Sequence, residues 1–254
     1  MRESYPLPPD PGRQYSTLPQ VADAPARFGL GAGALDAVLG GGLERGRLHE
    51  MHAAAEADLP SMAGFALMLA LRAGGRNGNI IWLSEAKRDR GLLHGPGILE
   101  LGADPARLLF VTVPDEKALL RAAADVVRSP AAGTAVIAPG PRPRLLDLTA
   151  TRRLMLFAER SGVTVLLLRG IGAEAPSAAA TRWRIAAAPS KPLEADAPGA
   201  PAFTVDLLRR RGGAPSPGWR LEWDRDAAAF APHVGITPLS GDLAADAGGR
   251  RLAG

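Results

Sequence analysis

Short apolar runs alternate with segments of helical periodicity through the middle of the chain, and this alternation restricts the fold more than any other feature of the sequence. The predicted strands carry Ile, Val and Leu at consecutive positions, as expected of parallel strands buried on both faces. They are Arg47–His52, Asn79–Ser84, Leu108–Val113, Thr134–Ala138 and Val163–Leu168. The predicted helices between them are Leu59–Arg72, Pro114–Arg128 and Leu145–Ser161. The series predicts an α/β fold, a three-layer α/β/α sandwich around a mostly parallel sheet.

The pattern changes after about residue 182, where strand-like runs follow one another without helices. These runs predict antiparallel strands that extend the sheet, and they are Trp183–Ala187, Phe203–Leu208 and Trp219–Trp223. We expect one core domain over residues 27–230, with a Pro-rich loop insertion at 189–201. Residues 1–26 are predicted to be a flexible lead-in and residues 231–254 a flexible tail, because neither carries a periodic apolar pattern.

The composition excludes several classes of site. The chain has no cysteine, which excludes disulfides, thiolate metal centres and thiol nucleophiles. Its four histidines are scattered, so no metal site is expected. The longest apolar stretch, Met62–Leu71, is too short for the roughly 20 residues of a membrane span. Without a signal-peptide core, the predicted location is the cytoplasm. The net charge of +4 favours a polyanionic partner only mildly.

The loop after the first strand is where a fold of this kind would bind a nucleotide. A phosphate-binding loop needs glycines, whose backbone N–H groups approach the phosphates, and a lysine that neutralises them. Residues 53–58 read AAAEAD, so the loop has no glycine and carries the carboxylates of Glu56 and Asp58. No lysine or arginine lies between Arg47 and Arg72. The sequence therefore predicts a degenerate nucleotide site that binds no cofactor.

The acid that would hold magnesium is also missing from its expected place. No carboxylate follows the inner strands Thr134–Ala138 and Val163–Leu168. Only Glu85, after the strand Asn79–Ser84, could activate a water molecule, and a solvated or helix-capping role is the stronger interpretation of it. We expect a protein that is not an enzyme, with an ATPase built on an unusual site as the alternative.

The segment before the first strand is the entry to a recognisable core. Residues 28–50 read FGLGAGALDAVLGGGLERGRLHE, in which Leu35, Val38 and Leu39 predict a short amphipathic helix and Gly40–Gly42 a turn. This stretch resembles the beginning of a RecA-type core. The order of strands that follows also resembles RecA, and the resemblance covers about residues 27–224.

Within that superfamily the chain is most similar to the ImuA family. The features that carry the likeness, besides the glycine-rich entry and the degenerate loop, are Trp82-Leu83 with Glu85, and Arg209–Gly213 leading to Trp219–Asp224. The resemblance implies an accessory role in SOS-induced, error-prone translesion synthesis. The implied partners are the RecA recombinase or its filament, an ImuB-type polymerase-like protein and an error-prone polymerase. Single-stranded DNA is a candidate further partner, and a SulA-like inhibitor of cell division is the alternative function.

Two groups of arginines are the candidate DNA-binding or partner-binding residues. Arg169, Arg182 and Arg184 border residues 170–181, which correspond to the second DNA-binding loop of RecA and are predicted to be mobile. Arg209, Arg210 and Arg211 stand together at a strand end. Arginines so placed would contact phosphates without regard to base sequence. The neighbouring Trp183 is expected to lie in the core.

Overall fold

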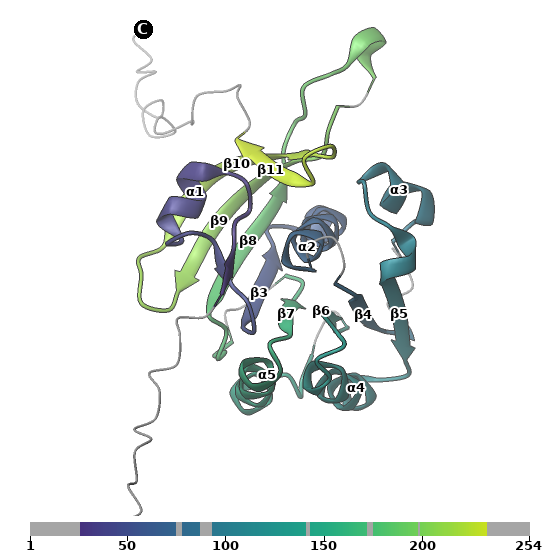
Figure 1. Ribbon diagram of the computed structural model, residues 1–254, viewed down its shortest axis with the longest axis vertical. Coiled ribbons are helices and arrows are strands. Elements are labelled where there is room, and N and C mark those ends of the chain that lie inside the picture. Colours follow the sequence, from purple (N-terminus) through teal and green to yellow (C-terminus); the bar gives the residue numbers. More distant parts are fainter. Residues whose placement is uncertain are drawn as a thin grey trace, which may run out of the picture.

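The computed structural model describes residues 26–74, 78–86, 93–140, 143–171, 175–197 and 199–232 (Figure 1). The predicted flexible lead-in, apart from residue 26, and the predicted tail from residue 233 lie outside these ranges. No helix among the described residues is long and apolar enough to cross a lipid bilayer.

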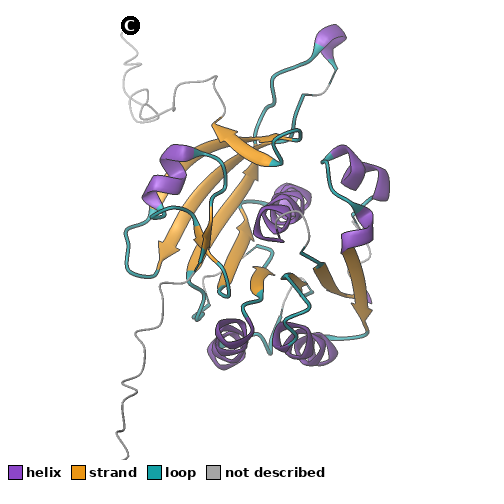
Figure 2. Ribbon diagram, in the orientation of Figure 1, coloured by secondary structure: helices purple, strands orange, loops and turns teal. Residues whose placement is uncertain are grey.

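One nine-stranded sheet forms the middle of the described structure (Figure 2). Its strands are β3 (Leu48–Ala53), β4 (Ile80–Glu85), β5 (Leu108–Val113), β6 (Thr134–Ala138), β7 (Thr164–Leu168), β8 (Thr181–Ala187), β9 (Ala202–Arg210), β10 (Ser216–Asp224) and β11 (Ala229–Pro232). Their order across the sheet is β11-β10-β9-β8-β3-β7-β6-β4-β5. From β5 to β8 every pairing is parallel, and from β8 to β11 every pairing is antiparallel. The change of pattern predicted near residue 182 is confirmed for β9 and β10, which are antiparallel. For β8 the prediction is wrong on one side, because this strand joins β3 in parallel and only its other neighbour, β9, is antiparallel.

Helices cover both faces of the parallel half and complete a three-layer sandwich (Figure 1). The longest, α2 (Leu59–Gly74), packs on one face, and α4 (Glu116–Arg128) and α5 (Leu148–Ser161) pack side by side on the other. A short helix, α3 (Gly95–Glu100), lies between β4 and β5 in the chain. Single turns of 3-10 helix described in full are η1 (Glu56–Asp58), η3 (Pro105–Arg107) and η4 (Glu194–Asp196).

Aspartate side chains set the first residues of α4 and α5. Asp115 accepts a hydrogen bond from the N–H of Ala118, and Asp147 accepts one from the N–H of Ala150, both at 2.8 Å. These N-caps satisfy backbone donors that have no partner within the helix. Both helices therefore begin two or three residues after the predicted starts. Gly162 is the C-cap of α5 and has a left-handed backbone, with a φ of 80°.

Several short elements carried no clear sequence pattern. Helix α3 and strand β11 were not predicted, and neither was the antiparallel pair of β1 (Arg27–Phe28) and β2 (Leu43–Glu44). Strand β11 also crosses the predicted boundary between core and tail, because it continues to Pro232. The insertion at 189–201 is largely loop, with η4 in it.

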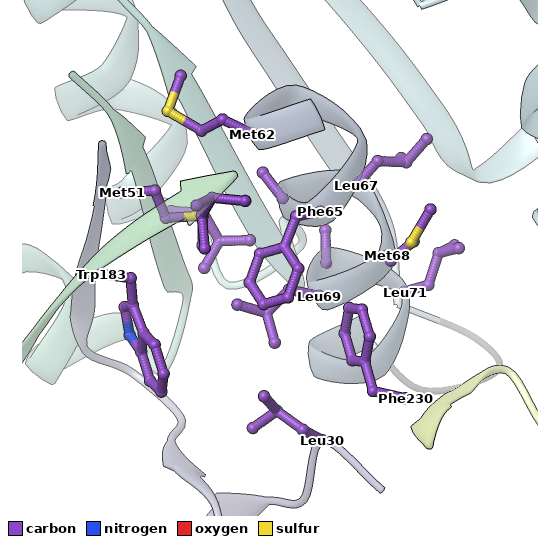
Figure 3. Packing of buried hydrophobic residues seen from close by; sticks show 14 of the residues in the cluster. Leu30, Met51, Met62, Phe65, Leu67, Met68, Leu69, Leu71, Trp183 and Phe230 are labelled. Carbon is purple, nitrogen blue, oxygen red and sulfur yellow. The ribbon is translucent and has the colours of Figure 1, made fainter. Parts of the chain in front are cut away.

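Aromatic rings hold the far strands of the sheet to α2 (Figure 3). Phe65 of α2 lies 5.4 Å from the ring of Phe203 on β9 and 4.8 Å from that of Phe230 on β11. Trp223 of β10 meets Phe230 edge to face at 5.0 Å. As expected, Trp183 is buried in the same cluster. The antiparallel half is thus part of the same core as the parallel half.

The glycine-rich entry folds as a short helix and a tight return. Helix α1 (Gly33–Val38) confirms the predicted amphipathic helix, and its Leu35 is fully buried. Gly42 has a φ of +114°, and a Cβ at that position would lie 2.2 Å from the carbonyl oxygen of Phe28. Only glycine fits this close approach, which brings β2 beside β1.

Candidate functional site

The loop between β3 and α2, where a nucleotide would bind in this fold, is tied to the protein itself. Asp58 accepts hydrogen bonds from the N–H groups of Ala55, at 3.1 Å, and of Ala187 at the end of β8, at 2.8 Å. The N–H of Ala53 is bonded to the carbonyl of Gly170, and that of Ala54 to the carbonyl of Ile185. Backbone donors that a phosphate loop would present to its ligand therefore already have partners, and one of those partners is an anion.

Glu85 at the end of β4 has a structural partner as well. Its Oε1 accepts a hydrogen bond of 2.8 Å from the N–H of Gly140, in the loop that follows β6. The carboxylate thus fastens two neighbouring strand ends, a structural role that differs from the helix cap expected from the sequence. Among the described residues, no cluster of three or more His, Asp or Glu side chains could hold a metal ion.

A buried charge cluster lies on the α5 side of the sheet and is centred on Glu50 of β3. The Glu50 side chain is fully buried, with its Oε1 2.6 Å from Nε of Arg169 and its Oε2 3.4 Å from Nη2 of Arg182. His52, two residues further along the same strand face, donates from Nε2 to Oε1 at 3.2 Å. Three strands, β3, β7 and β8, contribute to or end beside this cluster.

The charge state of Glu50 follows from these contacts. Burial acts to raise the pKa of its carboxyl group, because a charge is poorly solvated there. Hydrogen bonds from His52 and Ser177, together with the charges of Arg169 and Arg182, outweigh burial and hold the pKa of Glu50 below its ordinary value. The carboxylate is therefore ionised at neutral pH and serves as the counterion of two buried arginines.

Arg182 of this cluster, together with Arg209 of β9, fixes the segment that was predicted to be a mobile loop. Arg182 donates to the carbonyl of Ala175 at 2.7 Å, and Arg209 donates to the carbonyl of Ser177 at 3.0 Å. Ala178 donates its N–H to Thr151 of α5 at 3.2 Å. For residues 175–181 the prediction of a mobile loop is wrong, because small side chains let this segment pack closely against α5 and β3.

The candidate arginines do not form one surface. Arg169 and Arg182 are only 8% and 5% exposed, so the prediction that they contact phosphates at the surface is wrong. The carboxylate of Glu50, which lies on a different strand, offsets part of their positive charge. Arg209 is exposed but holds the segment 175–181 through Ser177. Arg184 is exposed and pairs with Asp206 on the uncovered face of the antiparallel strands, at 2.8 Å.

Arg210 and Arg211 line a basic pocket of about 560 Å³ at the amino ends of β3 and β8. Arg27 and Arg47 also line it, and both pair with Glu44. Arg210 donates to the carbonyl of Val38 in α1. Among the described residues, Arg211 makes no side-chain hydrogen bond or ion pair. Of the six candidates, Arg211 thus has the guanidinium most available to a ligand.

A buried histidine forms the floor of this basic pocket. His49 donates from Nε2 to the carbonyl of Glu44, at 2.9 Å, and its Nδ1 lies 2.8 Å from Oγ1 of Thr181. Trp183 donates to the same hydroxyl at 2.7 Å. Burial lowers the pKa of His49 to about 4, so the ring is neutral at physiological pH.

We expect His49 to make the protein less stable in mild acid. The unfolded chain binds a proton on this ring below about pH 6.5, whereas the folded protein does so only below about pH 4. Stabilisation by His49 is thus complete above pH 6.5 and is lost as the pH falls to 4, an effect of up to about 3 kcal/mol. Urea unfolding of the protein and of His49→Gln between pH 7 and 4 measures it. Equal pH dependence in both proteins would contradict the assignment.

Sequence reasoning missed Glu50, although the strand that carries it holds a usable signal. Leu48, Glu50 and His52 lie on one face of a strand that is otherwise expected to be buried on both sides. A carboxylate in such a place needs a cation, and Arg169 and Arg182 stand at the edges of two other predicted strands. Strand order, which the sequence pattern does not give, was needed to bring them together.

Comparison with known proteins agrees with the fold and identifies the family. No protein-family model matches the chain. The crystal structure of the RadB recombinase superposes with a TM-score of 0.57 at 15% identity, covering 81% of this chain and 99% of that chain, which supports a RecA-like fold. The protein ImuA from two strains of Caulobacter vibrioides is 36% identical over 228 residues, which cover 84% of this chain and 90% of that protein. On this similarity the chain belongs to the ImuA family.

Proposed function

We propose that the protein is a non-catalytic, RecA-like accessory protein in SOS-induced, error-prone translesion DNA synthesis. Membership of the ImuA family and the RecA-like fold support an accessory role in a mutagenesis cassette. In the proposed role it binds the RecA recombinase or its filament, an ImuB-type polymerase-like protein and an error-prone polymerase. Single-stranded DNA is a candidate further ligand.

The main support for a non-catalytic role in this proposal is the pair of hydrogen bonds that the Asp58 carboxylate accepts. The carboxylate occupies the N–H groups of Ala55 in the loop and of Ala187 at the end of β8, and the loop supplies no cation. A triphosphate brought to this position would meet a negative charge where RecA-type proteins place a lysine. Glu85 is bonded to Gly140, so the one carboxylate near a catalytic position also holds the fold together.

Fewer of the six candidate arginines are assigned to partner or DNA contact in this proposal than the sequence predicted. Arg182 and Arg209 hold the segment 175–181, and Arg169 is bonded to Glu50 and to the carbonyl of Leu146, so all three are assigned to structure. Arg211, with Arg210 beside it in the basic pocket, is the residue we assign to an anionic partner. The exposed Arg184 is the remaining candidate.

Binding of labelled ATP and a pull-down after DNA damage test the proposal together. We expect no saturable ATP binding at micromolar concentration with magnesium, and recovery of the recombinase or a cassette polymerase with the tagged protein. Glu85→Gln, which keeps an oxygen acceptor for Gly140, is expected to leave damage-induced mutagenesis unchanged. ATP binding together with loss of mutagenesis in this variant would support an ATPase. Recovery of the division protein alone would support a SulA-like inhibitor.

A further inference from the structure

A second pocket lies between α4 and α5, on the side of the sandwich that faces away from the sheet. It has a volume of about 400 Å³ and is separate from the basic pocket beside His49. Its floor is apolar, formed by Leu120 and Ala124 of α4, Ala150, Leu154 and Phe157 of α5, and Leu145 before α5. The floor residues of each helix recur at intervals of three and four, so they form one face of that helix.

Leu145 keeps the floor partly open to solvent. Its side chain is 50% exposed, although it lies at one end of the apolar floor. Glu116 at the start of α4 accepts the N–H groups of Arg144, Leu145 and Leu146, at 2.7 to 3.0 Å. The exposed leucine is therefore held at the end of the pocket by specific hydrogen bonds.

The rim of the pocket carries an excess of positive charge. Lys117 and Arg121 of α4 and Arg153 of α5 line it, and within the described ranges none of them forms an ion pair. Asp125, the one acid among the described residues of the rim, is paired with Arg128. The Arg128 guanidinium also lies 5.3 Å from the centre of the Phe157 ring. An apolar floor bounded by three cations without counterions is complementary to a ligand that is both apolar and acidic.

We propose that this second pocket, an open groove between α4 and α5, docks an acidic amphipathic helix of a protein partner. The helices α4 and α5 have 13 and 14 residues, so the groove runs for about 20 Å, the length of a helix of similar size. Apolar side chains at intervals of three and four would cover the floor, and flanking carboxylates would meet Lys117, Arg121 and Arg153. Nucleic acid fits less well, because its apolar surfaces are base faces suited to stacking on an aromatic ring, and the Phe157 ring already has the Arg128 guanidinium over it. The inference rests on the proposed function only in that an accessory protein needs a partner.

Fluorescence anisotropy with designed peptides tests the groove directly. The probe is a labelled helical peptide of about 16 residues with leucines on one face and glutamates beside them. Two control peptides replace its leucines by serine or its glutamates by lysine, and oligo-dT serves as the nucleic-acid probe. We expect the leucine–glutamate peptide alone to bind at the groove. The double variant Arg121→Glu/Arg153→Glu should weaken its binding about tenfold or more.

Matched variants separate docking in the groove from net charge. Lys191→Glu/Arg225→Glu makes the same charge change at exposed sites outside the groove and should leave peptide binding unchanged. Leu145→Ser should weaken binding without altering net charge or the unfolding midpoint. Equal binding of the serine peptide, equal loss in the control variant, or oligo-dT binding sensitive to the groove variant would each overturn the proposal. Because no cassette protein is used, the result is independent of the pull-down that tests the proposed function.

Discussion

Replacing Glu50 with glutamine is expected to lower the free energy of unfolding by about 3–5 kcal/mol. The amide has the size of the carboxylate, so the change removes charge and leaves the packing volume as it was. Arg169 and Arg182 would then lose the buried carboxylate that offsets their charge, and removing one partner of a buried ion pair is far more costly than losing a surface pair. Urea unfolding measures the loss.

A second readout shows whether the cluster also holds the segment 175–181. Arg182 joins Glu50 to the carbonyl of Ala175, so Glu50→Gln should make this segment more susceptible to limited proteolysis. The matched control is Asp206→Asn, which removes the partner of the exposed Arg184 and should cost no more than about 1 kcal/mol. Similar losses in the two variants would show that Glu50 is not the counterion of buried arginines.

Phe65→Ala is expected to cost about 3–5 kcal/mol, because the ring is buried and contacts the rings of Phe203 and Phe230. The cavity would lie where α2 meets β9 and β11, so the antiparallel edge should loosen first. Hydrogen exchange of β10 and β11, measured beside urea unfolding, would detect this as earlier opening than in β6 or β7.

Leu99→Ala on α3 is the control for Phe65, since its side chain is 55% exposed. We expect it to change stability by no more than about 0.5 kcal/mol. Uniform acceleration of exchange in all strands of the Phe65 variant would contradict the view that this residue chiefly anchors the antiparallel edge.

The sequence was sufficient for the parts of the fold that local pattern determines. Continuous apolar runs predicted β3 to β7 to within one residue, and β5 and β6 have the predicted bounds. The starts of α4 and α5 were predicted less accurately. The sequence pattern placed them at Pro114 and Leu145, but the N-caps in the structure are Asp115 and Asp147. Strand β11 escaped prediction because four residues carry too little pattern, and it depends on pairing with β10 and contact with Phe65.

The candidate site was less predictable than the fold, because the role of a charged residue depends on which residues lie next to it in the folded chain. Arg169 and Arg211 look alike in sequence, yet one lies against Glu50 and the other on the rim of a pocket. Glu50 and Arg182 are 132 residues apart, and the parallel pairing of β3 with β8 makes them neighbours. The degenerate loop was easier to predict, since the missing glycines and lysine can be read directly from the sequence. The hydrogen bond from the N–H of Ala187 to Asp58 could not be predicted, because it depends on how the loop packs against β8.

That bond has a consequence for timing. RecA-type proteins with a working site can use nucleotide exchange and hydrolysis to switch between conformations. The rate of hydrolysis can then set how long they stay bound to their partners. In the proposed function, a loop already fastened by Asp58 to β8 offers no such cycle. Association with partners would then follow mass action alone: the complex would persist for as long as its components are abundant, and synthesis and degradation of the protein would set its lifetime.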